Sequence, residues 1–446
     1  MESFYEYLTK EGYLFDKETI ENYLLSLKVK PFTILTGNSG TGKTKLSQLF
    51  ASYISTEKII ANETIDTEVT VGKSYSSNGW SLKREDCDKL MPIKEYENEY
   101  KIKVDGINAK GKLRINPRLF YSGKELKNHL EELATNDPKQ KISMQIELNS
   151  EENSNSKSNY KIIPVGANWT ENRNIIGYYN LITEEYQSTP AYELIKEAIK
   201  NPEEPHFLIL DEMNLSHVER YFADFLSAIE SGEEIPLYGI DESLKIPNNL
   251  FIIGTVNVDE TTYMFSPKVL DRANTIEFET FPADRYMFEN YNLQSPEGDI
   301  KYLEDPLTDL NLKNMKISEI KEKFQDVKVD GEEFWTVFTN ETYKFQEILK
   351  QSGFEFGFRV INEITRFMYV AWKYEGQPQN WVNWYRYFDA QIKQKMLPKL
   401  HGSEKIIGDT LEDLKKETEN KYPSSNKKLE EMLKVLEKQR YVSFIN

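Results

Sequence analysis

The chain is poor in cysteine, in histidine and in long apolar stretches. Cys87 is its one cysteine, so no disulfide can form within the chain, and its four histidines are too few for us to expect a zinc site. No apolar run approaches the roughly 18 residues of a membrane helix, and the acidic, aromatic start Met-Glu-Ser-Phe-Tyr-Glu lacks a signal-peptide pattern. These shortages exclude disulfide scaffolds and membrane-spanning chains, and we expect a cytoplasmic protein.

Positive charge is scarce as well. The sequence has 56 basic and 73 acidic residues, for a formal net charge of −17. A protein that binds nucleic acid over its whole surface needs an excess of lysine and arginine, so any DNA contact should be local or made by a partner. The hydrophobic content of 39% and charged content of 29% are typical of globular proteins, and 446 residues suffice for two or three domains.

One glycine-rich stretch carries the clearest information. Residues 37–44 read Gly-Asn-Ser-Gly-Thr-Gly-Lys-Thr and fit the P-loop pattern G-x-x-x-x-G-K-[ST]. The apolar segment Pro31 to Thr36 predicts a buried strand before it, and Lys43 to Ile54 has apolar residues at helical spacing after it. The backbone N–H groups of such a turn, with the helix dipole, bind phosphate oxygens. The alternative is a glycine turn that happens to precede a lysine.

The predicted ligand is a nucleoside triphosphate, GTP or ATP, bound with Mg²⁺. Lys43 would reach the β- and γ-phosphates, and the Thr44 hydroxyl would hold the ion. The expected nucleotide-binding residues are Gly37, Asn38, Ser39, Gly40, Thr41, Gly42, Lys43, Thr44 and Lys45.

Two further strand-like runs end in polar residues suited to hydrolysis. Phe207 to Leu210 is apolar and precedes Asp211 and Glu212. At a strand end, Asp211 would hold the Mg²⁺ shell, and Glu212 would position and activate the attacking water. Asn257 follows a second apolar run, Leu250 to Thr255, and would orient that water. The alternatives are a carboxylate pair that only ends a strand and an asparagine that only makes a turn.

Two arginines are candidates for contact with the terminal phosphate. Arg272 would act on the nucleotide of a neighbouring subunit, where an arginine supplied in trans is worth about 10³–10⁵ in rate. Its alternative role is a surface ion pair with Asp271. Arg359 stands just before a predicted helix, Val360 to Ala371, and would touch the γ-phosphate from the lid.

The order of elements predicts an α/β protein with a helical C-terminal part. Residues 1–71 and 161–282 alternate helices with buried strands, which indicates a parallel-sheet core. Residues 72–160 are an α/β insertion, and residues 283–446 are mostly helical and form a lid. The insertion is either a decoration or a module that contacts a partner or DNA.

Within the insertion, several segments have distinct patterns. Tyr96 to Val104 and Gly111 to Tyr121 predict a β-hairpin, Gly123 to Ala134 predicts a helix, and Lys141 to Leu148 alternates like a strand. Residues 150–159 form a polar low-complexity loop.

Elsewhere, five shorter segments give predictions that a structure can check. Asp16 could cap a helix, Lys58 to Ile60 is a second strand candidate, and Pro190 to Lys200 is a helix. Val218 to Ser231 reads as one amphipathic helix. The aromatic stretch Trp381 to Tyr387 could stack on bases, but we expect it to form lid core and subunit packing.

In this order, the motifs resemble an AAA+ ATPase module, and more narrowly the McrB-like motor subunits of modification-dependent restriction systems. The resemblance covers most of the chain outside 72–160. The segments that carry it are Leu35–Leu46, Trp169–Arg173, Gly177–Asn180, Asp211–Leu215, Val218–Glu219, Tyr221–Phe222, Gly254–Thr262 and Gly357–Glu363.

The resemblance implies a ring, commonly a hexamer, with nucleotide between neighbouring subunits and Arg272 as the finger. It also implies a McrC-like partner that carries the nuclease, so no nuclease activity is expected in this chain. Such a complex translocates and cleaves DNA in defence against phage. Two rivals remain: a MoxR-like remodeller of proteins, and a nucleotide-dependent scaffold that only recruits a nuclease.

Two departures from the family pattern matter. McrB proteins that prefer GTP carry a Met-Asn-Thr-Ala-Asp-type sequence, whereas Val256 to Glu260 reads Val-Asn-Val-Asp-Glu here, so ATP and GTP are both open. Only about 30 residues precede the P-loop, where family members usually have a target-reading domain. Recognition would then come from the insertion, the partner or a region outside this chain.

Overall fold

A computed structural model shows the fold of the chain. It describes residues 3–60, 64–70, 79–81, 99–104, 106–114, 119–121, 128, 132, 141–147, 159–259, 263–280, 296, 298–304, 307 and 315–445. The chain forms two compact units: the first is Met1–Ile54 with Asn159–Asn446, and the second is Ser55–Ser158. Among the helices in these ranges, none has the length and apolar character that crossing a bilayer requires.

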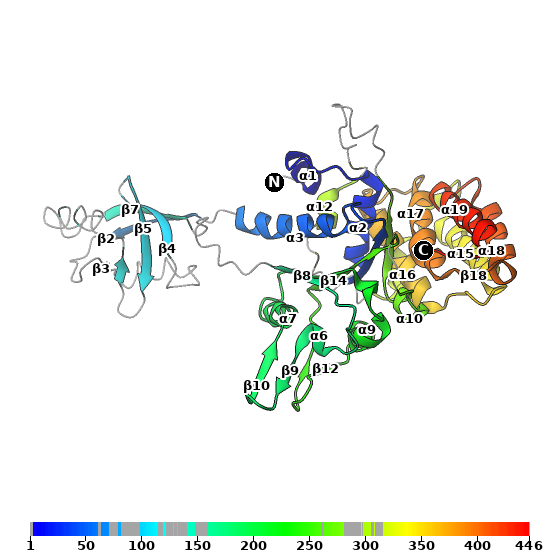
Figure 1. The fold of residues 1–446 in the computed structure, drawn as a ribbon. Coiled ribbons are helices and arrows are strands. Elements are labelled where there is room, and N and C mark those ends of the chain that lie inside the picture. The colour runs from blue at the N-terminus through cyan, green and yellow to red at the C-terminus, as the bar shows by residue number, and fades with distance from the viewer. Residues whose placement is uncertain are drawn as a thin grey trace. The chain divides into compact units, whose positions relative to one another are not determined.

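The centre of the first unit, within the described residues, is a five-stranded sheet (Figure 1). Its spatial order is β15 (Asn274–Phe278), β1 (Phe32–Gly37), β14 (Leu250–Asn257), β11 (His206–Asp211) and β8 (Tyr160–Pro164). Every neighbouring pair is parallel. All carboxyl ends therefore lie at one edge of the sheet, here called the carboxyl edge, and all amino ends lie at the opposite amino edge. The expected parallel α/β core is confirmed.

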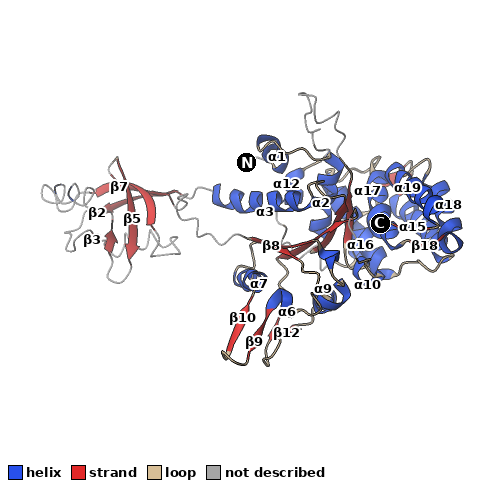
Figure 2. Ribbon diagram, viewed as in Figure 1, coloured by secondary structure: helices blue, strands red, loops and turns tan. Residues whose placement is uncertain are grey.

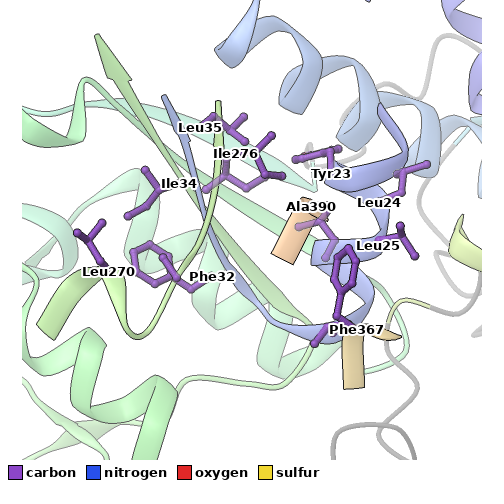
Figure 3. Close-up of a cluster of buried hydrophobic side chains, with 14 of the residues drawn as sticks. Tyr23, Leu24, Leu25, Phe32, Ile34, Leu35, Leu270, Ile276, Phe367 and Ala390 are labelled. Carbon is purple, nitrogen blue, oxygen red and sulfur yellow. The ribbon is translucent and has the colours of Figure 1, made fainter. Parts of the chain in front are cut away.

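Helices cover the sheet, and their apolar side chains form the core between them. The helices of this layer include α2 (Lys17–Val29), α3 (Lys43–Ile60), α7 (Pro190–Lys200) and α9 (Ala223–Ser231). All six residues of β1 are buried, as expected for a parallel strand covered on both faces. Figure 3 shows part of this core, with labelled side chains from α2 (Tyr23, Leu24, Leu25), β1 (Phe32, Ile34, Leu35), β15 (Ile276) and the C-terminal helices (Phe367, Ala390).

The C-terminal part of the first unit is helical, as expected (Figure 2). Its helices are α14 (Ile317–Lys323), α15 (Phe334–Lys350), α16 (Phe358–Tyr374), α17 (Trp384–Gln391), α18 (Glu404–Thr418) and α19 (Pro423–Gln439). Trp381, Trp384 and Tyr387 are at most 1% exposed, and both tryptophans pack on the Phe334 ring. Their role in lid packing is confirmed, since a buried ring cannot stack on a base.

In the core, the predicted cap of α2 and the predicted bounds of α7 are confirmed; both are long, regular helices. Asp16 caps α2 through a hydrogen bond from the Thr19 N–H, and α7 has the expected bounds. The strand at Lys58–Ile60 is wrong, because these residues end α3.

The single helix over Val218–Ser231 is also wrong. The structure has α8 (Val218–Tyr221) and α9 with a break at Phe222, where ψ is 6°. The break lets Tyr221 and Phe222 both be fully buried, and the Tyr221 hydroxyl donates a 2.7 Å hydrogen bond to the Met213 carbonyl. Burial of two adjacent aromatic rings outweighs the helical periodicity.

The second unit contains, in its described residues, a six-stranded antiparallel sheet. The strand order is β2 (Thr64–Thr70), β7 (Lys141–Glu147), β4 (Glu99–Val104), β5 (Ile107–Arg114), β6 (Leu119–Tyr121) and β3 (Gly79–Ser81).

The insertion starts earlier in the chain than the expected residue 72. Strand β2 pairs with β7 along its whole length, so it belongs to the second unit. The expected hairpin is present as β4–β5, although its second strand begins at Ile107. Most of the predicted helix 123–134 and nearly all of the loop 150–159 lie outside the described residues.

A buried ion cluster joins the amino edge to the C-terminal helices. The Glu363 carboxylate of α16 accepts from Lys30 Nζ at 2.5 Å and lies 2.7 Å from Lys395 Nζ. Lys395 Nζ also donates to the carbonyls of Asp271 at 3.2 Å and Ala273 at 2.7 Å. Burial and the Lys395 charge lower the pKa of Lys30 to about 7, so Lys30 is charged at acidic pH. Burial alone would raise the pKa of Glu363, but the two ammonium groups outweigh it and lower that pKa to about 2.

We expect Glu363→Gln to lower the free energy of unfolding by about 3–5 kcal/mol, because two buried ammonium groups lose their carboxylate. In the wild type, this contribution is complete above pH 4.5, the ordinary pKa, and is lost as the pH falls toward 2. Urea unfolding at about pH 5.5, where Lys30 is charged, and again near pH 3 should show a smaller difference between wild type and variant at the lower pH. Glu355→Gln, at an exposed position, is the control, and equal stabilities of the two variants would contradict the prediction.

Candidate functional site

The ends of three strands bring the predicted polar residues together at the carboxyl edge. Strand β14 lies between β1 and β11, and Gly37 of β1 is in register with Asn257 of β14. Leu210 of β11 is in register with Gly254, so Asp211 follows beside Thr255. Residues 220 positions apart (Gly37 and Asn257) and 44 positions apart (Leu210 and Gly254) are therefore neighbours in the sheet.

The P-loop connects β1 to α3, and all three of its glycines have backbone conformations that other residues rarely adopt; at two of them a Cβ would also clash. Gly37 has φ +147°, and a Cβ there would lie 2.4 Å from the Phe278 carbonyl oxygen. Gly42 has φ +89°, and its Cβ would lie 2.8 Å from the Phe15 ring. Since α3 begins at Lys43, the backbone N–H groups of the helix start belong to this loop.

The polar side chains of the loop are held by the loop and its surroundings. Lys43 is 4% exposed, and its Nζ donates to the carbonyls of Gly37 at 2.8 Å and Asn38 at 2.6 Å. The Ser39 N–H donates to the Asp259 carboxylate, at 3.0 Å to Oδ1 and 3.1 Å to Oδ2. The segment that follows β14 thus contacts the phosphate-binding turn directly. Lys45 points elsewhere, toward Gln48 Oε1 at 3.3 Å and over the Tyr13 ring.

Asp211 links the P-loop helix to the sheet. Its Oδ1 accepts from Thr44 Oγ1 at 2.6 Å and from Thr255 Oγ1 at 2.7 Å. A carboxylate and a hydroxyl in contact are the hard oxygen donors that Mg²⁺ takes when it is bound mainly through phosphates and water. Within the described ranges no group of three or more His, Cys, Asp or Glu side chains could form an all-protein metal site. Thr44 and Asp211 therefore fit a magnesium ion that accompanies a phosphate ligand.

Glu212 has a left-handed backbone, with φ +55° and ψ +49°. Such a conformation costs a non-glycine residue about 1 kcal/mol or more and is concentrated at functional sites. The Glu212 N–H donates to Thr255 Oγ1 at 3.1 Å, and its Oε1 accepts from Asn257 Nδ2 at 3.3 Å. The predicted base and the predicted water-orienting amide are therefore in contact.

A cavity of about 830 Å³ adjoins the P-loop. Its lining includes Thr41 of the loop, Phe15 and Asp16 before α2, Glu277 of β15 and Lys393 just after α17. Burial alone would raise the pKa of Glu277, but Lys393 and Lys428 outweigh it and lower that pKa. The volume is that of an ordinary small-ligand site and can accept the nucleoside part of a nucleotide.

The two arginines lie at the other edge of the sheet. Arg272 stands two residues before β15, and its Nε donates to Glu230 Oε2. Arg359, in the first turn of α16, pairs with Oε1 of the same carboxylate. The expected contact of Arg359 with a γ-phosphate stays a prediction; the structure places Arg359 beside Arg272 at the amino edge.

Three residues of this arrangement were missed in the sequence. Thr255 and Asp259 stand two positions before and two after Asn257. The period-two alternation of a strand predicts a shared face for the first pair, which could have revealed Thr255. Asp259 lies beyond the strand end, and Glu230 comes from another helix. Neither had a local signal. Glu260 to Thr262, part of the resemblance, lie outside the described residues.

Parts of the chain are similar to one protein family and to solved structures. A family described as a domain of unknown function (DUF8727) matches residues 310–441, which include the helices α14 to α19. No curated protein sequence matches the chain. A crystal structure of a candidate ATPase from Cytophaga hutchinsonii ATCC 33406 is similar over 53% of this chain and 68% of that chain, with 13% identity and a TM-score of 0.32. At that TM-score the likeness carries no argument about activity, which has to come from the site itself.

The conformation of Gly37 gives a test of the loop geometry. Gly37→Ala should lower the free energy of unfolding by more than about 2 kcal/mol, because its Cβ adds a backbone clash to an unfavourable φ. Gly40→Ala is the matched control. Gly40 also has a positive φ (+76°), but no atom lies within 4 Å of the added carbon, so a loss of about 1 kcal/mol is expected. Chemical denaturation measures both, and equal losses would contradict the geometry.

Proposed function

We propose that this protein hydrolyses nucleoside triphosphates. The proposal rests on one observation: the P-loop, the Thr44–Asp211 pair and the Glu212–Asn257 pair converge at the carboxyl edge of one parallel sheet. In open parallel sheets, ligands bind outside the carboxyl ends of the strands. The glycine turn alone accounts for phosphate binding, whereas the carboxylates and the amide beside it account for hydrolysis.

Binding would begin with the loop. The N–H groups at the start of α3 face the phosphates, and Lys43 leaves its carbonyl partners to contact the β- and γ-oxygens. Thr44 and Asp211 would hold Mg²⁺, which neutralises charge on the phosphates when bound. The Asp259–Ser39 contact keeps the turn in place while Lys43 moves.

Hydrolysis would depend on Glu212. Its carboxylate accepts a proton from the water that attacks the γ-phosphorus, and the bond from the γ-phosphorus to the bridging oxygen breaks as the new P–O bond forms. Asn257 Nδ2, now on Glu212 Oε1, would orient the carboxylate and the water together. The left-handed backbone of Glu212 aims its side chain away from the strand direction and toward Asn257.

We further propose that the chain works as an AAA+ ring motor in a McrBC-like restriction complex, with a McrC-like nuclease partner and DNA as the translocated polymer. The sequence motifs support this proposal, and so does the strand order, in which β14 separates the P-loop strand from β11. Neither Arg272 nor Arg359 lies at the site of its own subunit, because both are at the amino edge. A neighbour that presents this edge would complete it.

Glu212→Gln tests the hydrolytic role. We expect nucleotide binding to persist and turnover to fall by about 10²–10⁴-fold, since the amide cannot accept the proton. Fluorescent-nucleotide binding and phosphate release, each with ATP and with GTP, measure the two properties. Lys43→Ala should lose binding, and Glu347→Gln, at an exposed ion pair with Lys350, is the control for a carboxylate loss. Unchanged turnover in Glu212→Gln would refute the assignment.

A second test concerns the neighbouring subunit. Arg272→Ala and Lys43→Ala should each be inactive alone, yet a mixture should recover turnover, because some interfaces pair an intact P-loop with an intact arginine. Sedimentation must show that mixed rings form. If mixed rings form without any recovered turnover, Arg272 does not act in trans. Stimulation by DNA rather than by a protein client would separate the restriction motor from a protein remodeller.

A further inference from the structure

Arg272 and Arg359 come from different elements but share one carboxylate. Glu230, near the end of α9, pairs through Oε2 with Arg272 and through Oε1 with Arg359. The side chains are partly exposed, at 23% for Arg272, 46% for Arg359 and 26% for Glu230. Together, the two guanidinium groups and the carboxylate form a surface cluster with a formal charge of +1. Its two arginines are here called the arginine pair.

Two of these residues oppose the preference of their own helix. Glu230 is in the last turn of α9, where the helix dipole disfavours an anion, and Arg359 is in the first turn of α16, where it disfavours a cation. Each misplacement costs about 0.3–1 kcal/mol near a helix end. The helix dipole therefore does not explain why a glutamate ends α9 or why an arginine begins α16, whereas the ion pair between the two side chains does. Such local conflicts are concentrated at functional sites.

The backbone behind the arginine pair is held rigidly. Lys395 donates to the carbonyls on both sides of Arg272, those of Asp271 and Ala273. Glu363, one helical turn after Arg359, is fixed in the buried ion cluster. The two guanidinium groups are thus presented from anchored segments. Phe358, next to Arg359, is 85% exposed, which is the kind of aromatic side chain that anchors a subunit interface.

The arginine pair lies at the amino edge, opposite the P-loop of its own subunit. Strand β15 runs from Asn274 at the amino edge to Phe278 at the carboxyl edge. At 3.3 Å per residue it spans roughly 13 Å. Arg272 precedes this strand, and Arg359 reaches the same carboxylate as Arg272. Both guanidinium groups therefore lie at the amino edge, whereas Gly37 to Thr44 lie at the carboxyl edge.

We infer that Glu230 is a positioning residue that holds Arg272 and Arg359 as one receptor for the triphosphate of a neighbouring subunit, so that Arg359 acts in trans with Arg272. This inference rests on the proposed function. Two guanidinium forks held by a shared carboxylate match the oxygens of a terminal phosphate and lose little freedom when they bind it. The net positive charge of the cluster offsets the repulsion between Glu230 and the incoming phosphate.

Subunit mixing tests the role of Arg359. We expect Arg359→Ala to be nearly inactive alone and to recover turnover when mixed with Lys43→Ala, as Arg272→Ala does. An arginine that acts on its own subunit's nucleotide gives no recovery in that mixture, because neither subunit then holds a complete site. If the Arg272→Ala mixture recovers turnover and the Arg359→Ala mixture does not, the inference is overturned for Arg359.

Glu230→Gln tests the positioning role. We expect kcat to fall about tenfold or more with KM within about twofold, since misplaced arginines weaken the transition state most. Glu230→Asp should recover part of the rate. Because a protein that carries Arg272→Ala and Arg359→Ala has almost no turnover to lose, stability is the readout in that background. There Glu230→Gln should not lower the free energy of unfolding further, whereas the loss of a purely structural residue would still lower it. Glu233→Gln, at an exposed position three residues away, is the matched control.

The proposed function and the positioning role of Glu230 can be disproved separately. If the wild type hydrolyses neither ATP nor GTP with DNA and a nuclease partner present, the proposed function is wrong. If the wild type is active while Glu230→Gln keeps the kcat of Glu233→Gln, the proposed function stands and the positioning role is wrong.

Discussion

The hydrogen bonds that Asp211 Oδ1 accepts from Thr44 and Thr255 are the contacts on which the candidate site depends. They tie the first turn of α3, the end of β11 and the end of β14 into one unit. Thr255 in turn receives the Glu212 N–H, which stabilises the left-handed backbone that directs Glu212 to Asn257. Without the shared Asp211 oxygen, the loop and the two strands would have no common polar anchor.

A second constraint is the direction of the strands. Parallel strands put every carboxyl end at one edge, so the phosphate loop and the carboxylates gather there, while the segments that lead into the strands gather at the other. The buried charges of Lys30, Glu363 and Lys395 fix that second edge and with it the arginines. The proposed catalytic groups are thus split between two edges of one subunit, and this split is the physical reason for proposing a ring.

Much of the fold could be predicted because its signals are local. The P-loop, the helix at Pro190–Lys200 and the apolar run before Asp211 each lie within one short segment with regular periodicity. Lys58–Ile60 reads as a strand in the sequence but ends α3, because a short apolar run at a helix end has the same pattern as a short buried strand. The periodicity over Val218–Ser231 predicts one continuous helix, but the structure breaks it at Phe222, because the burial of Tyr221 and Phe222 depends on neighbours distant in sequence.

The chemistry of the loop and of the strand ends follows from the sequence alone. The glycines, the apolar runs and the polar residues that end them occupy consecutive positions, so local patterns reveal them. Which of these residues contact each other depends on the tertiary structure. It placed Thr255 on Asp211, Asp259 on Ser39, and Arg359 on the same carboxylate as Arg272. These contacts join residues separated by 44, 220 and 129 positions in the chain. They follow from sheet order and helix packing, which no local pattern encodes.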